Sequence, residues 1–285
     1  MPRNREKKRH DSQMADKQLK EQGLVYDDRT RKGKRDVNED VKFVRPWPDK
    51  SALLAVVVDG MGGHQGGKIA AEIVIDTFKE LLKQPLPETP ESRYQLLLDC
   101  FHKANTAIME RVLEGFKLGN SKLKDMGATL VAAIITSTEC LHLYAGDCRL
   151  YHFSQEIPFY MTDDHSVINL LIKSGEITFQ EAKNHRMRGV VTSCLGGGQN
   201  ARLSIAPKWD EDGSPAFRKL HPNDVLLLCS DGLHGAVSDF ELQNFTENYN
   251  SSPANITEKC VEAALKNGSG DNVTAIAIIA NNNSL

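Results

Sequence analysis

The feature that most constrains this chain is an apolar run that stops abruptly at an aspartate–glycine pair. Residues 52–58 are all apolar, and Asp59-Gly60 follows directly. A run of this length, rich in Val and Leu, is typical of a strand buried on both faces. A carboxylate at the end of such a strand is costly to bury unless a cation lies against it. Asp59 is therefore either part of a turn or part of a charged site.

The same pattern recurs along the chain. It is found at Gly146-Asp147 after the run 141–145, at Asp231-Gly232 after 225–229, and at Gly270-Asp271 before 273–279. One such pair is explained by a turn. Four of them indicate strand ends that converge on a shared site. Crowded carboxylates repel one another, and hard divalent cations relieve that repulsion. An all-oxygen set favours Mg²⁺ or Mn²⁺ over Zn²⁺.

Length and composition exclude several classes of protein. The 285 residues suffice for one large or two small domains, and the net charge of −3 gives no bias toward nucleic acid or an anionic membrane. No apolar run is long enough to span a membrane, and the N-terminus is too charged for a signal peptide. The six cysteines form no C-x-x-C pair. Their placement favours a reducing compartment, so we expect a cytoplasmic protein.

The ends of the chain differ in character. Residues 1–22 are dense in charged residues and lack apolar periodicity, which predicts a disordered leader. The basic cluster at 3–9 could instead contact an acidic partner. We expect residues 23–285 to form a single domain.

Periodicity predicts the order of elements in that domain. Helices are expected over 67–83, 92–115, 239–248 and 253–266, and strands over 41–44, 52–58, 127–135, 140–145, 149–153, 159–161, 190–194, 201–205, 225–229 and 273–279. The stretch 165–189 is polar and helical, and we interpret it as an insertion over the edge of the sheet. The order indicates an α+β fold, with two antiparallel sheets packed together and helices outside.

A charged segment precedes the first of these strands. It contains Arg35 and the pair Glu39-Asp40. One interpretation is an exposed charged turn. The other is that Arg35 enters the site, because a guanidinium binds two phosphate oxygens at once. A complete phosphate-binding P-loop is absent, since Ile69 follows Lys68 where Ser or Thr is required.

The motifs together resemble a known family. They are R-D-V-N-E-D at 35–40, D-G-M-G-G-H at 59–64, G-A-T-L at 127–130, G-D-C-R at 146–149, T-D-D-H-S at 162–166, S-D-G at 230–232 and G-D-N at 270–272. In this order and spacing they resemble the PP2C-type (PPM) metal-dependent serine/threonine protein phosphatases, especially the compact bacterial members. The resemblance covers about residues 25–280. It implies an αββα sandwich in which 165–189 is a flap beside the active site.

The resemblance also implies a role for each matching position. The ligands of two or three Mn²⁺ or Mg²⁺ ions would be Asp59, Gly60, Asp231, Asp271, Glu39 and Asp147. Asp40 and Asn272 would support these ligands without binding an ion directly. Asp59 would bridge two ions, and Arg35 would clamp the substrate phosphate. The general acid is left open between His64 and a metal-bound water, because Met61 stands where eukaryotic members carry the histidine. Cys148 replaces a common serine, and we expect this change to affect packing only.

The implied activity is hydrolysis of phosphoserine and phosphothreonine in proteins. A water or hydroxide that bridges two ions would attack the phosphorus. The alternative is a catalytically silent relative that acts as a regulatory binding module, although such relatives usually lose metal-binding aspartates. The expected partners are phosphorylated proteins and a cognate serine/threonine kinase. We expect a monomer that binds neither nucleic acid nor membrane.

Overall fold

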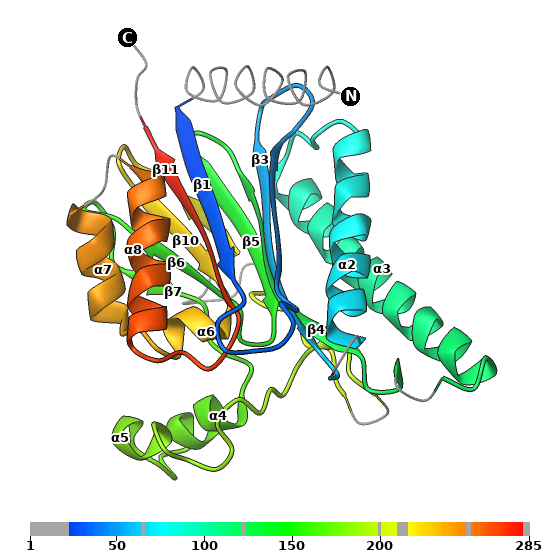
Figure 1. Cartoon of the computed structure of the whole chain (residues 1–285). Helices are drawn as coiled ribbons and strands as arrows, with labels where there is room; N and C mark the ends of the chain where they lie inside the picture. Colours follow the sequence, from blue (N-terminus) through cyan, green and yellow to red (C-terminus); the bar gives the residue numbers. More distant parts are fainter. Residues whose placement is uncertain are drawn as a thin grey trace, which may run out of the picture.

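The computed structural model describes residues 23–63, 66–120, 123–198, 201–209, 216–248 and 252–281. Two β-sheets pack face to face between two layers of helices (Figure 1). All strand pairs in both sheets are antiparallel. The αββα sandwich expected from the sequence is confirmed. The leader 1–22 and His64 lie outside the described residues.

The strands divide between the sheets as follows. The first sheet contains, in spatial order, β1 (Leu24–Arg31), β11 (Val273–Ala280), β10 (Val225–Cys229), β6 (Arg149–Phe153) and β7 (Tyr160–Met161). The second contains β2 (Val41–Pro46), β3 (Leu53–Met61), β4 (Gly127–Ile135), β5 (Glu139–Ala145) and β9 (Phe217–Lys219), and β8 (Leu195–Gly196) pairs with β4.

The helices form the outer layers. They are α2 (Gly66–Lys79), η1 (Glu80–Lys83), α3 (Pro90–Lys117), α4 (Val167–Lys173), α5 (Phe179–Ala182), α6 (Asp231–His234), α7 (Asp239–Asn248) and α8 (Pro253–Lys266). Figure 1 shows α2 and α3 beside the second sheet, and α7 and α8 beside the first. None of the helices in the described ranges is long and apolar enough to cross a membrane.

Strand β3 shows why the apolar runs are continuous. Its side chains alternate in direction, as they do in any strand. Leu53, Ala55 and Val57 pack between the sheets, whereas the intervening Leu54, Val56 and Val58 join the core under α2 and α3. Both faces of β3 are therefore buried, and no polar position is tolerated until Asp59.

The pairing register brings the strand ends to one end of the sandwich. Asp59 is paired with Thr129 near the start of β4, and Ala145 at the end of β5 is paired with Leu130. In the other sheet, the end of β10 at Cys229 is paired with Ala275 near the start of β11. The connections after β3, β5 and β10 and before β11 consequently meet at the same end of the molecule (Figure 1).

Two predicted strands are wrong. Val191 forms only an isolated bridge with Ser166, and no strand is assigned within the described residues of 190–194 or 201–205. The short strand β8 at Leu195–Gly196 lies between them. Gly196 and the two glycines after it all have positive φ, so the chain cannot continue as an extended strand.

The region around 165–189 is helical and adds little to the core, as predicted, but its first helix α4 is mostly apolar in sequence (VINLLIK) rather than polar. Helix α4 contributes no buried residue, and α5 contributes only Ala182. Figure 1 shows α4 and α5 projecting beyond the sandwich, at the end where the strand connections meet. The core does not specify this segment, so its own caps and its contacts with neighbouring loops must hold it.

Candidate active site

The predicted acidic residues surround one cavity. It has a volume of about 240 Å³ and lies at the end of the sandwich described above. The residues singled out from the sequence that line it are Arg35, Glu39, Asp59, Gly60, Asp147, Asp231, Asp271 and Asn272. Asp40 is buried and does not line the cavity. Side chains more than 230 residues apart in sequence therefore share one space.

Glycines allow the walls of this cavity to approach closely. A Cβ on Gly60 would collide with the backbone of Gly67 in the first turn of α2, and a Cβ on Gly232 would collide with the carbonyl of Asn272. The first contact sets the end of β3 directly against α2. The second sets Asp231 beside Asp271, which are predicted metal ligands on different strand ends. Larger residues at either glycine would separate these walls.

Asn272 fixes the loop that carries Arg35 and Glu39. Its Oδ1 accepts a hydrogen bond from the Glu39 backbone N–H at 2.8 Å. Its Nδ2 donates to the carbonyls of Lys32 at 2.8 Å and Val37 at 3.0 Å. Because Asn272 directly precedes β11, these bonds hold the loop 32–39 to the end of the first sheet.

The carboxylates of the site disfavour one another's ionisation. Burial, opposed in part by hydrogen bonds from Thr274 and Ser230, raises the pKa of Asp40 to about 7. Burial and the charge of Asp231 raise the pKa of Asp147 to about 8. Burial and four neighbouring aspartates raise the pKa of Asp59 well above its usual range. Burial and Asp271 also raise the pKa of Asp231. Burial and like charges together therefore disfavour the ionised form of these carboxyl groups.

This donor set fits hard divalent cations. The Oδ1 atom of Asp231, which lines the cavity, is buried and accepts no hydrogen bond. Buried carboxylate oxygens without donors are costly, and a cation relieves that cost. Within the described ranges, no three His, Cys, Asp or Glu side chains are close enough together to hold a metal ion in their present positions. Asp271 instead forms an ion pair with Arg35, at 2.6 Å between Nη2 and Oδ2. The carboxylates therefore line one cavity, and they would have to move closer together to bind a cation.

Two arginines near the cavity differ in how they are bonded. Arg149 donates from Nε and Nη2 to both carboxylate oxygens of Asp164, at 2.7 and 2.8 Å, and from Nη1 to the Tyr151 hydroxyl. Burial raises the pKa of Asp164, and the bonds from Arg149 outweigh it, so that pKa is lowered overall. Arg35 is exposed and bonded to Asp271 alone among the described residues. Arg35 is thus the arginine that can exchange its partner.

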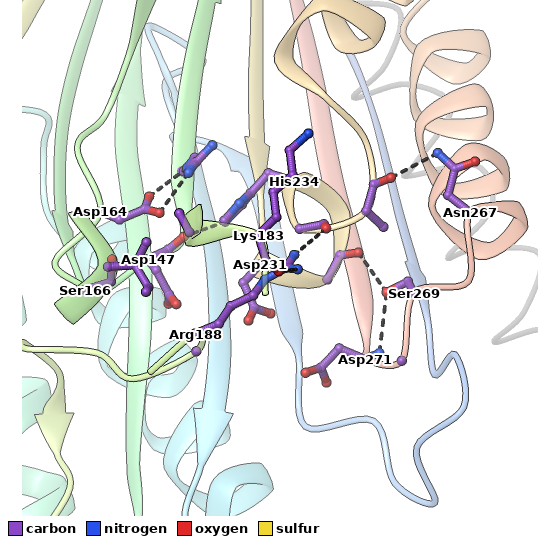
Figure 2. Close-up of a pocket in the computed structure, with 18 of the residues that line it drawn as sticks. Asp147, Asp164, Ser166, Lys183, Arg188, Asp231, His234, Asn267, Ser269 and Asp271 are labelled. Atoms are coloured by element: carbon purple, nitrogen blue, oxygen red, sulfur yellow. Dashed lines mark hydrogen bonds and ion pairs between the residues drawn. The ribbon is translucent and has the colours of Figure 1, made fainter. Parts of the chain in front are cut away.

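A second, larger cavity continues from the first. Its volume is about 760 Å³, and it lies between the flap and the α6 region (Figure 2). Both cavities are lined by Arg35, Asp147, Gly189, Asp231 and Asp271. In Figure 2, Arg188 extends across the larger cavity, between Asp147 on one side and Asp271 on the other. The Arg188 guanidinium donates to the carbonyls of Lys183 at 3.0 Å and Gly235 at 2.7 Å.

Several residues around the two cavities were not predicted from the sequence. His234 is one, and its Nε2 lies 2.9 Å from the carbonyl of Asp147. Burial and the nearby Arg149 lower the pKa of His234 to about 4, so the neutral ring donates this bond. Lys183 and Arg188 are others. The signal for His234 was its position three residues after Asp231, whereas Lys183 and Arg188 have no signal beyond the polar composition of the flap.

Comparisons with known proteins agree with this geometry. The model of the protein phosphatase 2C family matches residues 29–267. The serine/threonine phosphatase stp of Listeria innocua is 29% identical over 263 residues, which is 89% of this chain and 94% of that protein. The crystal structure of the serine/threonine phosphatase Stp1 from Staphylococcus aureus superposes with a TM-score of 0.76 at 27% identity, covering 90% of this chain and 94% of that one.

A further solved structure carries metal ions. The catalytic domain of the serine/threonine protein phosphatase PstP, in complex with two manganese ions, superposes with a TM-score of 0.71 at 25% identity. The match covers 90% of this chain and 97% of that one.

Proposed function

The chain belongs to the protein phosphatase 2C family, and from that premise we propose that it hydrolyses phosphoserine and phosphothreonine in proteins with divalent cations at the carboxylate-lined cavity. The observation that carries the proposal is the convergence of Asp59, Asp231 and Asp271 on one space from separate strand ends. The catalytic unit is residues 23–285, with residues 165–189 as its flap.

The cations are Mn²⁺ or Mg²⁺. Asp59, Asp231, Asp271, Glu39 and the Gly60 carbonyl would hold two of them, and Asp147 would contribute to a third. When bound, such ions activate a water molecule and neutralise charge on the phosphoryl oxygens. The chain's contribution is to hold the carboxylates together at a cost, which the raised pKa values of Asp59 and Asp231 reflect.

Arg35 binds the phosphate of the substrate. Its guanidinium is exposed and has one carboxylate partner, Asp271. An incoming phosphate offers two oxygens to the planar fork, which is a better match than one oxygen of Asp271. Asp40 and Asn272 support the site without binding the phosphate. Asn272 fixes the loop that carries Arg35, and Asp40 accepts a hydrogen bond from Ser230 at 2.7 Å.

His234 and Arg149 position the wall of the cavity. His234 donates to the backbone carbonyl of Asp147, which fixes the turn that carries this carboxylate. Arg149 holds Asp164 at the base of the flap through two bonds. The proton donor to the leaving serine or threonine stays open between His64, which lies outside the described residues, and a bound water.

The silent-module alternative is disfavoured. A relative without catalysis has no need to hold mutually repelling carboxylates around a cavity, and here each predicted acidic ligand lines it. The substrates are phosphorylated proteins. We further propose that a serine/threonine kinase supplies them, that the protein acts as a monomer, and that it is cytoplasmic. All six cysteines are free and buried, which suits a reducing compartment.

Phosphate release from a phosphothreonine peptide tests the activity. The wild-type protein should release phosphate with Mn²⁺ and lose that activity in excess EDTA. Asp59→Asn should abolish it at every Mn²⁺ concentration while the circular dichroism spectrum is retained. Equal activity of wild type and Asp59→Asn would contradict the assignment. Absence of wild-type activity, together with absence of Mn²⁺ binding in a calorimetric titration, would favour the binding-module alternative.

A further inference from the structure

The flap carries a small platform that faces the larger cavity. Helix α5 is a single turn, and Phe179, Ala182 and Lys183 all line the cavity. These positions are i, i+3 and i+4, so they share one face of the turn. The platform, defined as these three residues, therefore presents an aromatic ring, a small residue and an ammonium group side by side.

Two sets of bonds hold this platform in place. A capping box at its start satisfies the backbone, since the Thr178 side chain accepts from the Glu181 N–H and Glu181 accepts from the Thr178 N–H. At its end, Arg188 bonds the carbonyl of Lys183 and the carbonyl of Gly235, next to α6. Because α6 begins at Asp231, the platform has a defined spacing from the catalytic carboxylates.

The side chains of the platform have unused binding capacity. Phe179 is 78% exposed, the most exposed aromatic side chain in the described residues. The Lys183 ammonium makes no ion pair with any residue that the structure describes. The two carboxylates at the base of the flap have other partners, since Asp163 pairs with Lys173 and Asp164 is bonded by Arg149. The exposed ring of Phe179 can bind an apolar group, and the ammonium of Lys183 can bind an acidic one.

We propose that the α5 platform binds the segment that flanks the phosphorylated residue and selects phosphoproteins with an apolar and an acidic side chain in that segment. The inference rests on the proposed phosphatase function, because the platform cavity is continuous with the carboxylate cavity. A phosphate bound at Arg35 places its flanking residues in the 760 Å³ space, whose flap side is the platform. Phe179 contacts the apolar side chain, and Lys183 pairs with the acidic one.

Four phosphothreonine peptides of one length test this selection. One flanking position carries Glu or Lys and another carries Leu or Ser, and the four peptides are the four combinations. We expect wild type to prefer Glu over Lys by about fivefold in kcat/KM, since a solvent-exposed ion pair is modest. We expect it to prefer Leu over Ser by about fivefold, from partial burial of the apolar side chain.

Two variants assign the preferences to the platform. Lys183→Glu should invert the ratio between Glu and Lys peptides, and Phe179→Ser should remove the ratio between Leu and Ser peptides. Arg186→Glu is the matched control, because Arg186 is an exposed flap residue that does not line the cavity. This control should keep both wild-type ratios.

The outcomes separate this inference from the phosphatase activity. Hydrolysis of all four peptides at equal kcat/KM by wild type would overturn the inference and leave the activity standing. Ratios that Lys183→Glu and Phe179→Ser leave unchanged would also overturn it. If wild type hydrolyses neither the peptides nor p-nitrophenyl phosphate in Mn²⁺, the proposed function fails and the inference fails with it.

Discussion

Two groups of titratable side chains with buried carboxyl groups lie in the same sandwich, and they are built differently. One is the carboxylate cavity. The other links the sheets through His152, Arg218 and Asp224. His152 Nε2 lies 2.8 Å from Asp224 Oδ2, and Arg218 Nε donates to His152 Nδ1 at 2.9 Å. Each of these three side chains has a protein partner. We call them the inter-sheet triad.

The contrast shows in the pKa of the aspartates. Burial raises the pKa of Asp224, but bonds from His152, Ser154 and the His221 backbone outweigh burial, so the pKa is lowered overall. In the carboxylate cavity, burial and like charges act together, and the pKa of Asp59 is well above its usual range. Burial of charge therefore does not mark a functional site by itself. Unbalanced buried charge does, because a fold retains it at a cost.

The largest difference between the two groups is expected from the substitution Asp231→Asn in the carboxylate cavity. We expect kcat/KM on a phosphothreonine peptide with Mn²⁺ to fall at least about 300-fold, or about 3–4 kcal/mol, because a cation ligand is lost. In EDTA the same variant should be more stable than wild type by about 1 kcal/mol, because one of several repelling carboxylates is gone. Phosphate release and urea denaturation measure the two effects. A variant that is both active and less stable than wild type would show that Asp231 supports the fold and is not a cation ligand.

Asp224→Ala should give the opposite result. It leaves His152 and the His221 backbone N–H without their acceptor. We expect a loss of about 3 kcal/mol in the free energy of unfolding, from the uncompensated buried groups. The folded fraction should keep the wild-type kcat. Urea denaturation followed by activity below the transition checks both values. An unchanged stability would mean that the inter-sheet triad is not a structural element.

Arg35→Ala should weaken phosphate binding while the fold stays intact. We expect kcat/KM to fall about thirtyfold, or about 2 kcal/mol, from the loss of charge-assisted hydrogen bonds. Arg35→Lys should recover only part of the loss, because an ammonium cannot bind two oxygens in one plane. Steady-state kinetics with Mn²⁺ measures this. Full activity in the alanine variant would refute the role of Arg35.

The pH dependence of stability should also differ between the groups. The pKa values of Asp40 and Asp147, about 7 and about 8, are raised above the ordinary value of 3.8. A carboxyl group with a raised pKa contributes stability that is complete below the ordinary value of 3.8 and is lost progressively as pH rises to the raised value. In EDTA we therefore expect stability to fall by about 4 kcal/mol between pH 6 and pH 9, since each group loses about 1.4 kcal/mol per pH unit below its raised pKa.

Thermal denaturation across that pH range measures the slope. Asp40→Asn should make the slope shallower. Saturating Mn²⁺ should flatten it, because bound cations favour the ionised carboxylates and so lower their raised pKa in the folded state. A slope unchanged by both would show that these carboxylates do not control it.

The strands and site residues that could be predicted from the sequence are those that depend on a local pattern of residues. Strands β3 and β10 were predicted correctly because both of their faces are buried. The aspartates that line the cavity were singled out because each follows or precedes such a strand. Strand β1 was missed, since four of its eight residues are Asp or Arg. It lies at a sheet edge, where charges are tolerated. The platform could not be predicted, because its position depends on the bond from Arg188 to Gly235, 47 residues away.

A crystal structure with Mn²⁺, with anomalous scattering recorded to locate the ions, tests most directly whether cations occupy the carboxylate cavity. We expect anomalous density between Asp59, Asp231 and Asp271, and a second peak on the Glu39 side of Asp59. We also expect Arg35 to be released from Asp271. Mn²⁺ found only at other acidic residues, with the Arg35–Asp271 ion pair intact, would contradict this expectation.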